Sequence, residues 1–123
     1  RFAEAILLID QQLATAPVRT GLLLRRADVH EQAGRTKQAK EDREQALIEA
    51  DKVLARRATG IHLLSRARAY IALGRPEEAK RDLERVVQKS PKFLEAKNLL
   101  AKLKRGESER TIASTVGELS NDR

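Results

Sequence analysis

Two stretches that lie 40 residues apart decide the fold of this chain. Residues 23–44 read LLRRADVHEQAGRTKQAKEDRE, and residues 63–84 read LLSRARAYIALGRPEEAKRDLE. The leucine pair, the Arg-Ala pair, the Gly-Arg pair and the Ala-Lys pair fall at the same places in both stretches, and an aspartate and a glutamate follow in both. Matches in one order at one fixed shift indicate an internal repeat.

Each copy has the apolar spacing of a helix. Leu23, Ala27 and His30 share one helical stripe in the first copy, and Leu63 opens the same stripe in the second. Gly34 is expected to end the first helix, because glycine accepts the left-handed conformation that a C-terminal cap requires. A second helix follows at once, and its small residues allow two helices to approach closely. Each unit is therefore predicted to be a helix–turn–helix hairpin.

The unit resembles the tetratricopeptide repeat, a helix–turn–helix of about 34 residues. That repeat has a small residue midway along its first helix, an aromatic three positions later, a glycine at the turn, small residues in the second helix and a closing proline. The small residue of the first helix corresponds to Ala27, Ala67 and Ala101, and the aromatic corresponds to Tyr70, whereas His30 and Lys104 depart from it. The turn glycines are Gly34 and Gly74. The small residues of the second helix are Ala39, Ala46 and Ala79, with Val86 departing, and the closing prolines are Pro17 and Pro91. The resemblance covers roughly residues 2–105. It implies an all-α superhelix, a right-handed solenoid of antiparallel helix pairs.

The first unit departs from this pattern in its length. Asp51 stands where the closing proline is expected, and the two copies are spaced by 40 residues rather than 34, so six extra residues follow Leu47. Leu47, Ala50 and Leu54 keep helical spacing through this segment, which contains no helix breaker. We therefore expect the second helix of this unit to run on by about two turns, roughly 9 Å at 1.5 Å per residue.

The predicted organisation is one helical domain over residues 1–105, with a polar and flexible tail over 106–123. The helices are predicted at 2–15, 20–33, 36–57, 60–73, 76–89 and 92–105. Residues 2–5 match the opening of a second helix, so we expect a half repeat, then two full repeats and a C-terminal capping helix. The chain opens at Arg1 and contains no methionine, so its true N-terminus is expected to lie further upstream.

The composition argues against several kinds of chemistry. The chain has no cysteine, so it has no disulfide, no thiolate metal site and no cysteine nucleophile. This fits a reducing compartment, and with no apolar run of the roughly 20 residues that cross a bilayer it favours a cytoplasmic location. His30 occupies the packing position of Tyr70, and His62 opens a helix, so neither suggests a metal or catalytic site. We expect no enzyme activity, no cofactor and no metal.

The resemblance implies that the first helix of each unit lines a concave face that binds a partner protein or peptide. The residues expected on this face are Leu24, Arg25, Asp28, Gln32, Leu64, Ser65, Arg68, Ala72, Asn98, Leu99 and Lys102. Arg25, Arg68 and Lys102 bring three cations to it, which favours a ligand with acidic groups because arginine offers a bidentate fork to carboxylates. The alternative is that these are ordinary solvated surface charges.

The family also contains a carboxylate clamp that grips the C-terminal end of chaperones. The clamp needs a lysine and an asparagine on one first helix, an asparagine on the next, and a lysine and an arginine on the third. The residues at these places are Leu24 and Asp28, Ser65, and Glu95 and Leu99. The clamp is therefore absent, and chaperone-tail binding by this route is disfavoured.

The distribution of charge leaves a second function open. The net charge is +7, and residues 59–105 hold 12 basic against 5 acidic groups. The basic region 89–105 would suit an adaptor at an anionic membrane or a nucleic acid. Terminal capping is the better interpretation of its helix because it follows the last closing proline, and the region lacks the aromatic residues on which bases stack.

The helix predicted at 2–15 raises a further question. Ile6, Leu7, Ile9 and Leu13 form an apolar stripe, and the partner helix of that half repeat is missing from the sequence. An uncovered stripe of this kind attracts another surface. We expect either additional repeats before Arg1 or self-association of this helix with a second copy.

Overall fold

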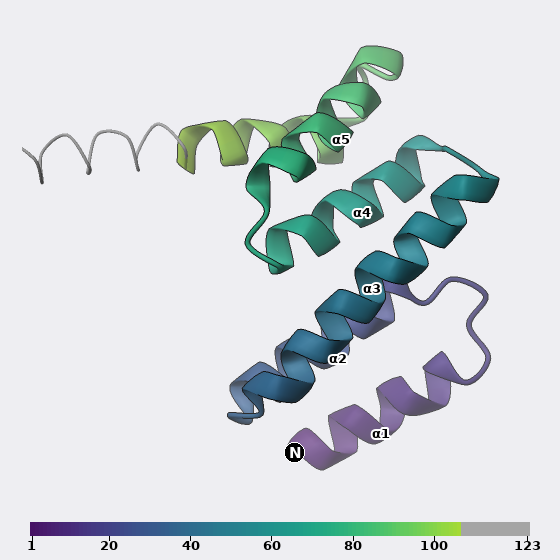
Figure 1. Ribbon diagram of the computed structural model, residues 1–123, viewed down its shortest axis with the longest axis vertical. Coiled ribbons are helices and arrows are strands. Elements are labelled where there is room, and N and C mark those ends of the chain that lie inside the picture. Colours follow the sequence, from purple (N-terminus) through teal and green to yellow (C-terminus); the bar gives the residue numbers. More distant parts are fainter. Residues whose placement is uncertain (107–123) are drawn as a thin grey trace, which may run out of the picture.

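The computed structural model describes residues 1–106, which are all-helical and contain no strand (Figure 1). The helices are α1 (Phe2–Leu13), α2 (Thr20–Gln32), α3 (Thr36–Arg56), α4 (Gly60–Ala72) and α5 (Pro76–Lys89). A further helix over residues 94–106 is called the C-terminal helix below. Of the predicted tail, only Gly106 is described, and it is helical; the remaining residues, 107–123, lie outside the described part of the chain.

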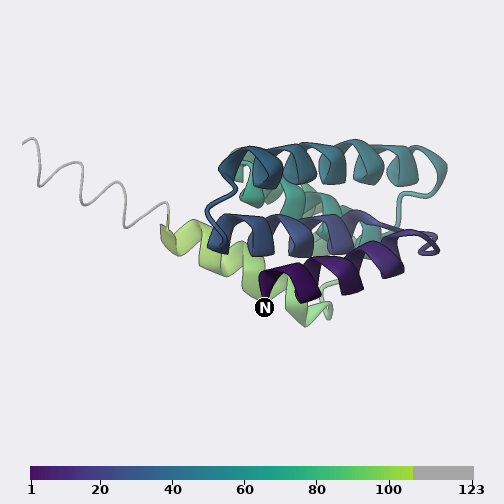
Figure 2. The same ribbon diagram turned by 90° about the horizontal axis from the view of Figure 1, so that it is seen from below.

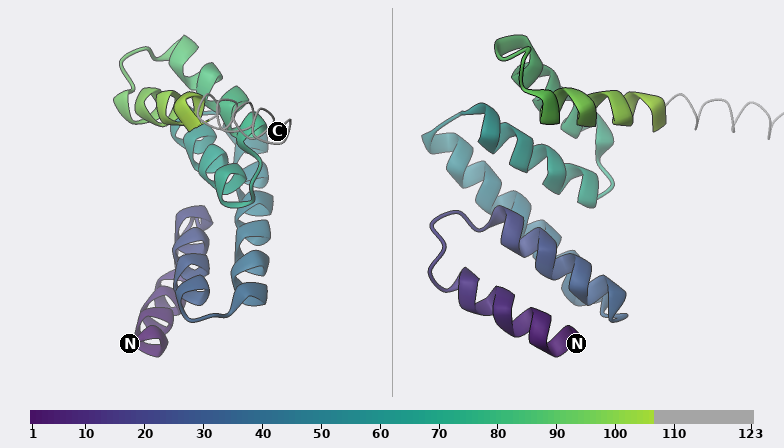
Figure 3. Two further views of the ribbon diagram at one scale, coloured as in Figure 1. Left: turned by 90° about the vertical axis from the view of Figure 1, so that its left-hand side faces the viewer. Right: turned by 180° about the vertical axis from the view of Figure 1, so that it is seen from behind.

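The helices stack in chain order as antiparallel hairpins (Figures 1 and 3). α2 packs against α3 and α4 against α5, while α3 joins the two hairpins by also packing on α4. α1 packs on α2 in the way that α3 packs on α4. This arrangement confirms the predicted α–α superhelix.

The turn inside each hairpin depends on a glycine. Gly34 has a φ of +78° and Gly74 a φ of +72°, and no other described residue has a positive φ. The residue after each glycine closes the turn with its backbone N–H group. The N–H of Arg35 donates to the carbonyl of His30 at 2.7 Å, and the N–H of Arg75 donates to the carbonyl of Tyr70 at 2.8 Å. Left-handed backbone is unfavourable for residues with a Cβ. The two glycines therefore stop their helices where the sequence predicted.

α3 is the long helix, as Figure 2 shows. It contains 21 residues against the 14 of α5, so the extra residues of the first unit extend it. The other ends lie within two residues of the predicted ones. α1 ends at Leu13 rather than 15, and residues 14–15 form a turn before Pro17. The C-terminal helix begins at 94 rather than 92 because residues 91–92 form a turn.

Small residues allow the helices to pack closely. Ala27, Ala39, Ala46, Ala67 and Ala79 are all fully buried where helices meet. Leucine and valine fill the remaining space in two core clusters. One cluster centres on Leu63, Leu83 and Val86, and the other on Ile9, Leu13 and Leu23. Within residues 1–106, the core is thus built without a fully buried aromatic side chain.

The apolar residues of α1 are divided between two faces. Ile9 and Leu13, which were expected to be uncovered, are buried against α2. Leu7 and Leu8 lie on the opposite side and are 59% and 62% exposed. The prediction of one uncovered stripe was therefore wrong in its residues, because α2 takes the Ile9 side of the helix. The exposed apolar face of α1 consists of Leu7 and Leu8.

Candidate protein-interaction surfaces

The face predicted to bind a partner is formed by α2, α4 and the C-terminal helix. Its exposed members are Arg25, Asp28, Gln32, Arg68, Ala72, Asn98 and Lys102. Leu24, Ser65 and Leu99 are half-buried, and Leu24 and Leu99 pack against the two core clusters. Leu64 is only 5% exposed, because it lies in the core cluster that also contains Ala96 and Leu100 of the C-terminal helix. Its side chain is therefore not available to a partner.

Ion pairs already engage part of the charge on this face. The guanidinium of Arg68 pairs with Glu95 of the C-terminal helix. Asp28 lies 3.6 Å from the guanidinium of Arg43, which also donates to Glu31 at 2.6 Å. The side chains of Arg25 and Lys102 make no ion pair or hydrogen bond within residues 1–106. The cations open to a ligand are therefore Arg25 and Lys102 rather than Arg68.

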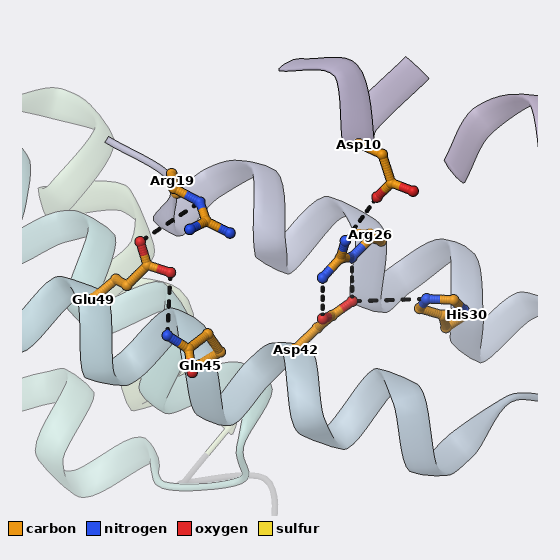
Figure 4. Close-up of polar contacts among 7 residues, drawn as sticks. All are labelled: Asp10, Arg19, Arg26, His30, Asp42, Gln45 and Glu49. Carbon is orange, nitrogen blue, oxygen red and sulfur yellow. Dashed lines mark hydrogen bonds and ion pairs between the residues drawn. The ribbon is translucent and has the colours of Figure 1, made fainter. Parts of the chain in front are cut away.

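The strongest polar contacts lie inside the helix stack. Arg26 of α2 donates from Nε and Nη2 to both carboxylate oxygens of Asp42 in α3, each at 2.8 Å, and from Nη1 to Asp10 in α1 at 2.7 Å (Figure 4). The fork geometry matches the carboxylate, which makes such bidentate bonds strong. We call Asp10, Arg26 and Asp42 the Arg26 cluster.

The second unit repeats this arrangement. Arg66 of α4 donates to both oxygens of Asp82 in α5 at 2.8 and 2.7 Å, and its Nη1 donates to Asp51 in α3 at 3.2 Å. We call Asp51, Arg66 and Asp82 the Arg66 cluster. The bond to Asp82 is the main cause that raises the pKa of Arg66 above its ordinary value. Both clusters bind three consecutive helices together.

Two further side chains lie beside these clusters. Nε2 of His30 lies 3.8 Å from a carboxylate oxygen of Asp42, a contact that Figure 4 marks with a dashed line. The imidazole is half-buried at the position that Tyr70 occupies in the next unit. The ring of Tyr70 lies between two guanidinium groups, with Arg66 at 5.6 Å and Arg75 at 5.0 Å from its centroid. Burial raises the pKa of Tyr70 above its ordinary value. The two guanidinium contacts of Tyr70 stabilise the hairpin of α4 and α5.

A groove of about 520 Å³ lies between α5 and the C-terminal helix. Val87 and Leu100 supply its apolar surface, and Arg81, Arg85 and Lys104 bring positive charge, with Glu84 the one acidic side chain that lines it. We call this the end groove. The sequence predicted the positive charge of this region but not the groove, because the groove depends on how the two helices cross.

The comparison with protein families gives one match, which covers residues 62–103 with the description tetratricopeptide repeat. These residues run from α4 through α5 into the C-terminal helix. The chain is a TPR-like repeat protein. TPR repeats are found in protein-interaction modules and are generally a non-catalytic scaffold. The comparison with curated proteins and that with solved structures gave no match.

The described part of the TPR-like structure shows neither a metal site nor a membrane-spanning helix. Within residues 1–106, no group of histidine and acidic side chains is arranged to hold a metal ion. None of the described helices has both the length and the apolar character to cross a membrane. The cytoplasmic location and the absence of a cofactor stay predictions.

Proposed function

We propose that this TPR-like chain is a scaffold that binds a peptide or partner protein with acidic groups on the face of α2, α4 and the C-terminal helix. The observation that supports this most is the state of Arg25, which is exposed and makes no ion pair within the described residues. A guanidinium in this state can take a carboxylate without first giving up another partner. Lys102 offers a second cation of the same kind at the far end of the face.

The apolar residues of the face would add contact area beside these cations. Leu24 and Leu99 are half-buried, so part of each side chain stays accessible. Packing against the core holds both leucines in place, so a ligand meets a surface that is largely preformed. Preorganisation of this kind reduces the entropy cost of binding.

The experiment is an array of unrelated short peptides that differ in net charge, probed with the wild type and with Arg25→Glu. The proposal expects acidic peptides to bind the wild type, and the variant to lose about tenfold in affinity, the effect of about 1.4 kcal/mol. Arg57→Glu is the matched control, because Arg57 is exposed and follows α3, outside the three helices that form this face. Equal loss in both variants, or no preference for acidic peptides, would contradict the proposal.

A second candidate function uses the basic region 89–105. Lys89, Lys92, Lys97 and Lys104 of this region are exposed, so an adaptor at an anionic membrane or a nucleic acid stays a proposal. Binding to phosphatidylserine vesicles or to duplex DNA would then weaken steeply with salt, since many exposed charges take part. Binding that is absent at low salt would exclude this function.

A further inference from the structure

α3 continues past the point where the matching helix of the next unit ends. α3 and α5 begin 40 residues apart, at Thr36 and Pro76, but α3 has 21 residues and α5 has 14. Residues 50–56 of α3 therefore have no counterpart in α5. Together with the segment 17–19, which joins α1 to α2, this extension lines a pocket of about 140 Å³. We call it the loop pocket.

The loop pocket lies on one side of the helix stack. Figure 1 shows the segment between α1 and α2, and the end of α3, at the right of the molecule. α1 begins, at the label N, and the C-terminal helix ends further to the left, and the view from behind in Figure 3 shows the same separation. The pocket is therefore formed by elements whose neighbours along the chain are all described.

Basic side chains predominate in the loop pocket. Arg19, Lys52 and Arg56 line it, and among residues 1–106 the acidic side chain beside them is Glu49, which leaves an excess of two positive charges. Lys52 and Arg56 lie four positions apart on one side of α3, where like charges repel each other. Neither side chain makes an ion pair or hydrogen bond with another residue of this range. A cation in the last turn complements the helix dipole, which accounts for Arg56 but not for the other two.

The guanidinium of Arg19 is also available to a ligand. Its Nε lies 3.7 Å from Oε1 of Glu49, which is too far for a hydrogen bond (Figure 4). The other carboxylate oxygen of Glu49 accepts a hydrogen bond from Gln45 at 3.3 Å. Nε of Arg19 is buried and has no hydrogen-bond partner in the described part of the chain, which costs free energy. A ligand that reorients this guanidinium would remove that cost.

The size and charge of the loop pocket select the chemical group that fits it. Pockets for whole small molecules usually measure about 300–1,000 Å³, so a pocket of about 140 Å³ suits a single polar group. A phosphate monoester carries a charge of about −1.5 to −2 at pH 7 and offers three strong acceptor oxygens. It matches the excess of two positive charges, whereas a carboxylate or the phosphate diester of a nucleic acid brings a single charge.

The rim of the pocket favours a protein as the source of this phosphate. Pro17, Val18 and Val53 are its apolar lining residues, and Val18 is 43% exposed. These side chains can contact the residues that flank a phosphorylated side chain in a peptide. The choice of a protein rests on the proposed scaffold function, but the loop pocket shares no residue with the face that contains Arg25.

We propose that the loop pocket binds the phosphate group of a phosphorylated serine or threonine in a partner protein. Arg19 and Arg56 offer forked donors that match phosphate oxygens, and Lys52 adds a compact positive charge. Binding of the partner at this site would then depend on its phosphorylation. The extension of α3 supplies two of the three cations, so a helix of the length of α5 could not form the site.

Fluorescence anisotropy tests the proposal with labelled short peptides whose flanking residues are randomised and whose central residue is phosphoserine, glutamate or serine. The phosphoserine pool is expected to bind the 123-residue chain at least about tenfold more tightly than the glutamate pool. Because the second pKa of the phosphate is about 6, binding should weaken as the pH falls from about 7.5 to about 5.5. Equal affinity for the two pools, or an affinity that does not change with pH, would overturn recognition of a phosphate dianion.

Variants locate the binding site on the molecule. Lys52→Ala with Arg56→Ala should weaken binding of the phosphoserine pool by about tenfold or more, and both side chains are exposed, so the helices should stay folded by circular dichroism. Lys37→Ala with Lys40→Ala is the matched control, because it removes two exposed cations from the other end of α3. Equal loss in both double variants would overturn the proposal. Loss in Arg25→Glu alone would assign the phosphopeptide to the other face and would also overturn it.

Glu49 gives a prediction of the opposite sign. Glu49→Gln removes the acidic charge from the loop pocket and keeps a side-chain oxygen that can accept from Gln45. Affinity for the phosphoserine pool should therefore rise by about threefold, and unchanged or weaker binding would contradict a phosphate at this place. Free phosphoserine is the last probe. If it binds as tightly as the peptide pool, the flanking residues contribute nothing, and the choice of a partner protein is overturned.

Discussion

Removal of one member of the Arg66 cluster should cost much more stability than removal of both members of its main pair. The side chain of Asp82 is only 5% exposed and receives two hydrogen bonds from Arg66. Arg66→Leu leaves this carboxylate buried and without its partner. Breaking a buried pair from one side costs about 3–5 kcal/mol. Because the side chain of Arg66 is 21% exposed, water can solvate part of the site, and we expect a loss of about 2–4 kcal/mol.

The double variant Arg66→Leu, Asp82→Leu removes the unpaired charge together with its partner. Well-packed apolar residues in place of a buried ion pair are often neutral or stabilising, so this variant should recover most of the loss. Urea denaturation followed by circular dichroism at 222 nm measures the free energy of unfolding of the wild type, both single variants and the double variant. A single variant that costs less than about 0.5 kcal/mol would refute the reasoning, because surface changes usually stay within that range. A double variant whose cost equals the sum of the singles would refute it as well, since it would show no coupling.

Three further predictions concern the turns, the close helix contacts and the tyrosine. Gly74→Ala should destabilise the chain by about 1–2 kcal/mol in thermal denaturation because its φ of +72° disfavours a Cβ. Gly21→Ala lies in the first turn of α2 with open space around it and should instead be neutral or stabilising, by at most about 0.5 kcal/mol; equal effects would contradict the left-handed turn. Ala67→Leu should cost about 1–3 kcal/mol by overpacking a fully buried site, while the exposed Ala101→Leu should change stability little; similar unfolding midpoints would contradict the close packing. Tyr70 is the single tyrosine, so absorbance at 295 nm reports its ionisation alone, and the midpoint should lie above the ordinary pKa of about 10. The raised pKa means that the folded state favours the neutral phenol. The contribution of Tyr70 to the free energy of unfolding is therefore complete below the pKa of the unfolded state and is lost as the pH rises from that pKa towards the pKa of the folded state. A midpoint at or below the ordinary pKa would contradict this.

Much of the fold could be predicted because it depends on local patterns. The glycine of each turn marks the end of a helix by its own conformational freedom, as Gly34 does with its positive φ. The long α3 was predictable because Leu47, Ala50 and Leu54 keep one helical face through the extra residues. These signals lie within about seven residues of one another, so they do not depend on the tertiary contacts of the chain.

The features that could not be predicted depend on contacts between units. Leu64 was placed on the binding face from its position in the repeat, but the next unit covers it through Ala96 and Leu100. Arg26 and Asp42 both recur 40 residues later, a signal that could have identified the arginine clusters. The recurrence does not show that the two side chains meet, because they are 16 residues apart on different helices. Only the crossing of the helices brings the guanidinium and the carboxylate together.

The two clusters give α3 a particular place in the molecule. α3 alone contributes to both, with Asp42 bound to Arg26 and Asp51 bound to Arg66. A protease cut within α3 would therefore loosen the anchors of both hairpins at once rather than trim one end of the stack. Partial digestion is then expected to yield either the whole helical region or short peptides, with few stable fragments of intermediate size.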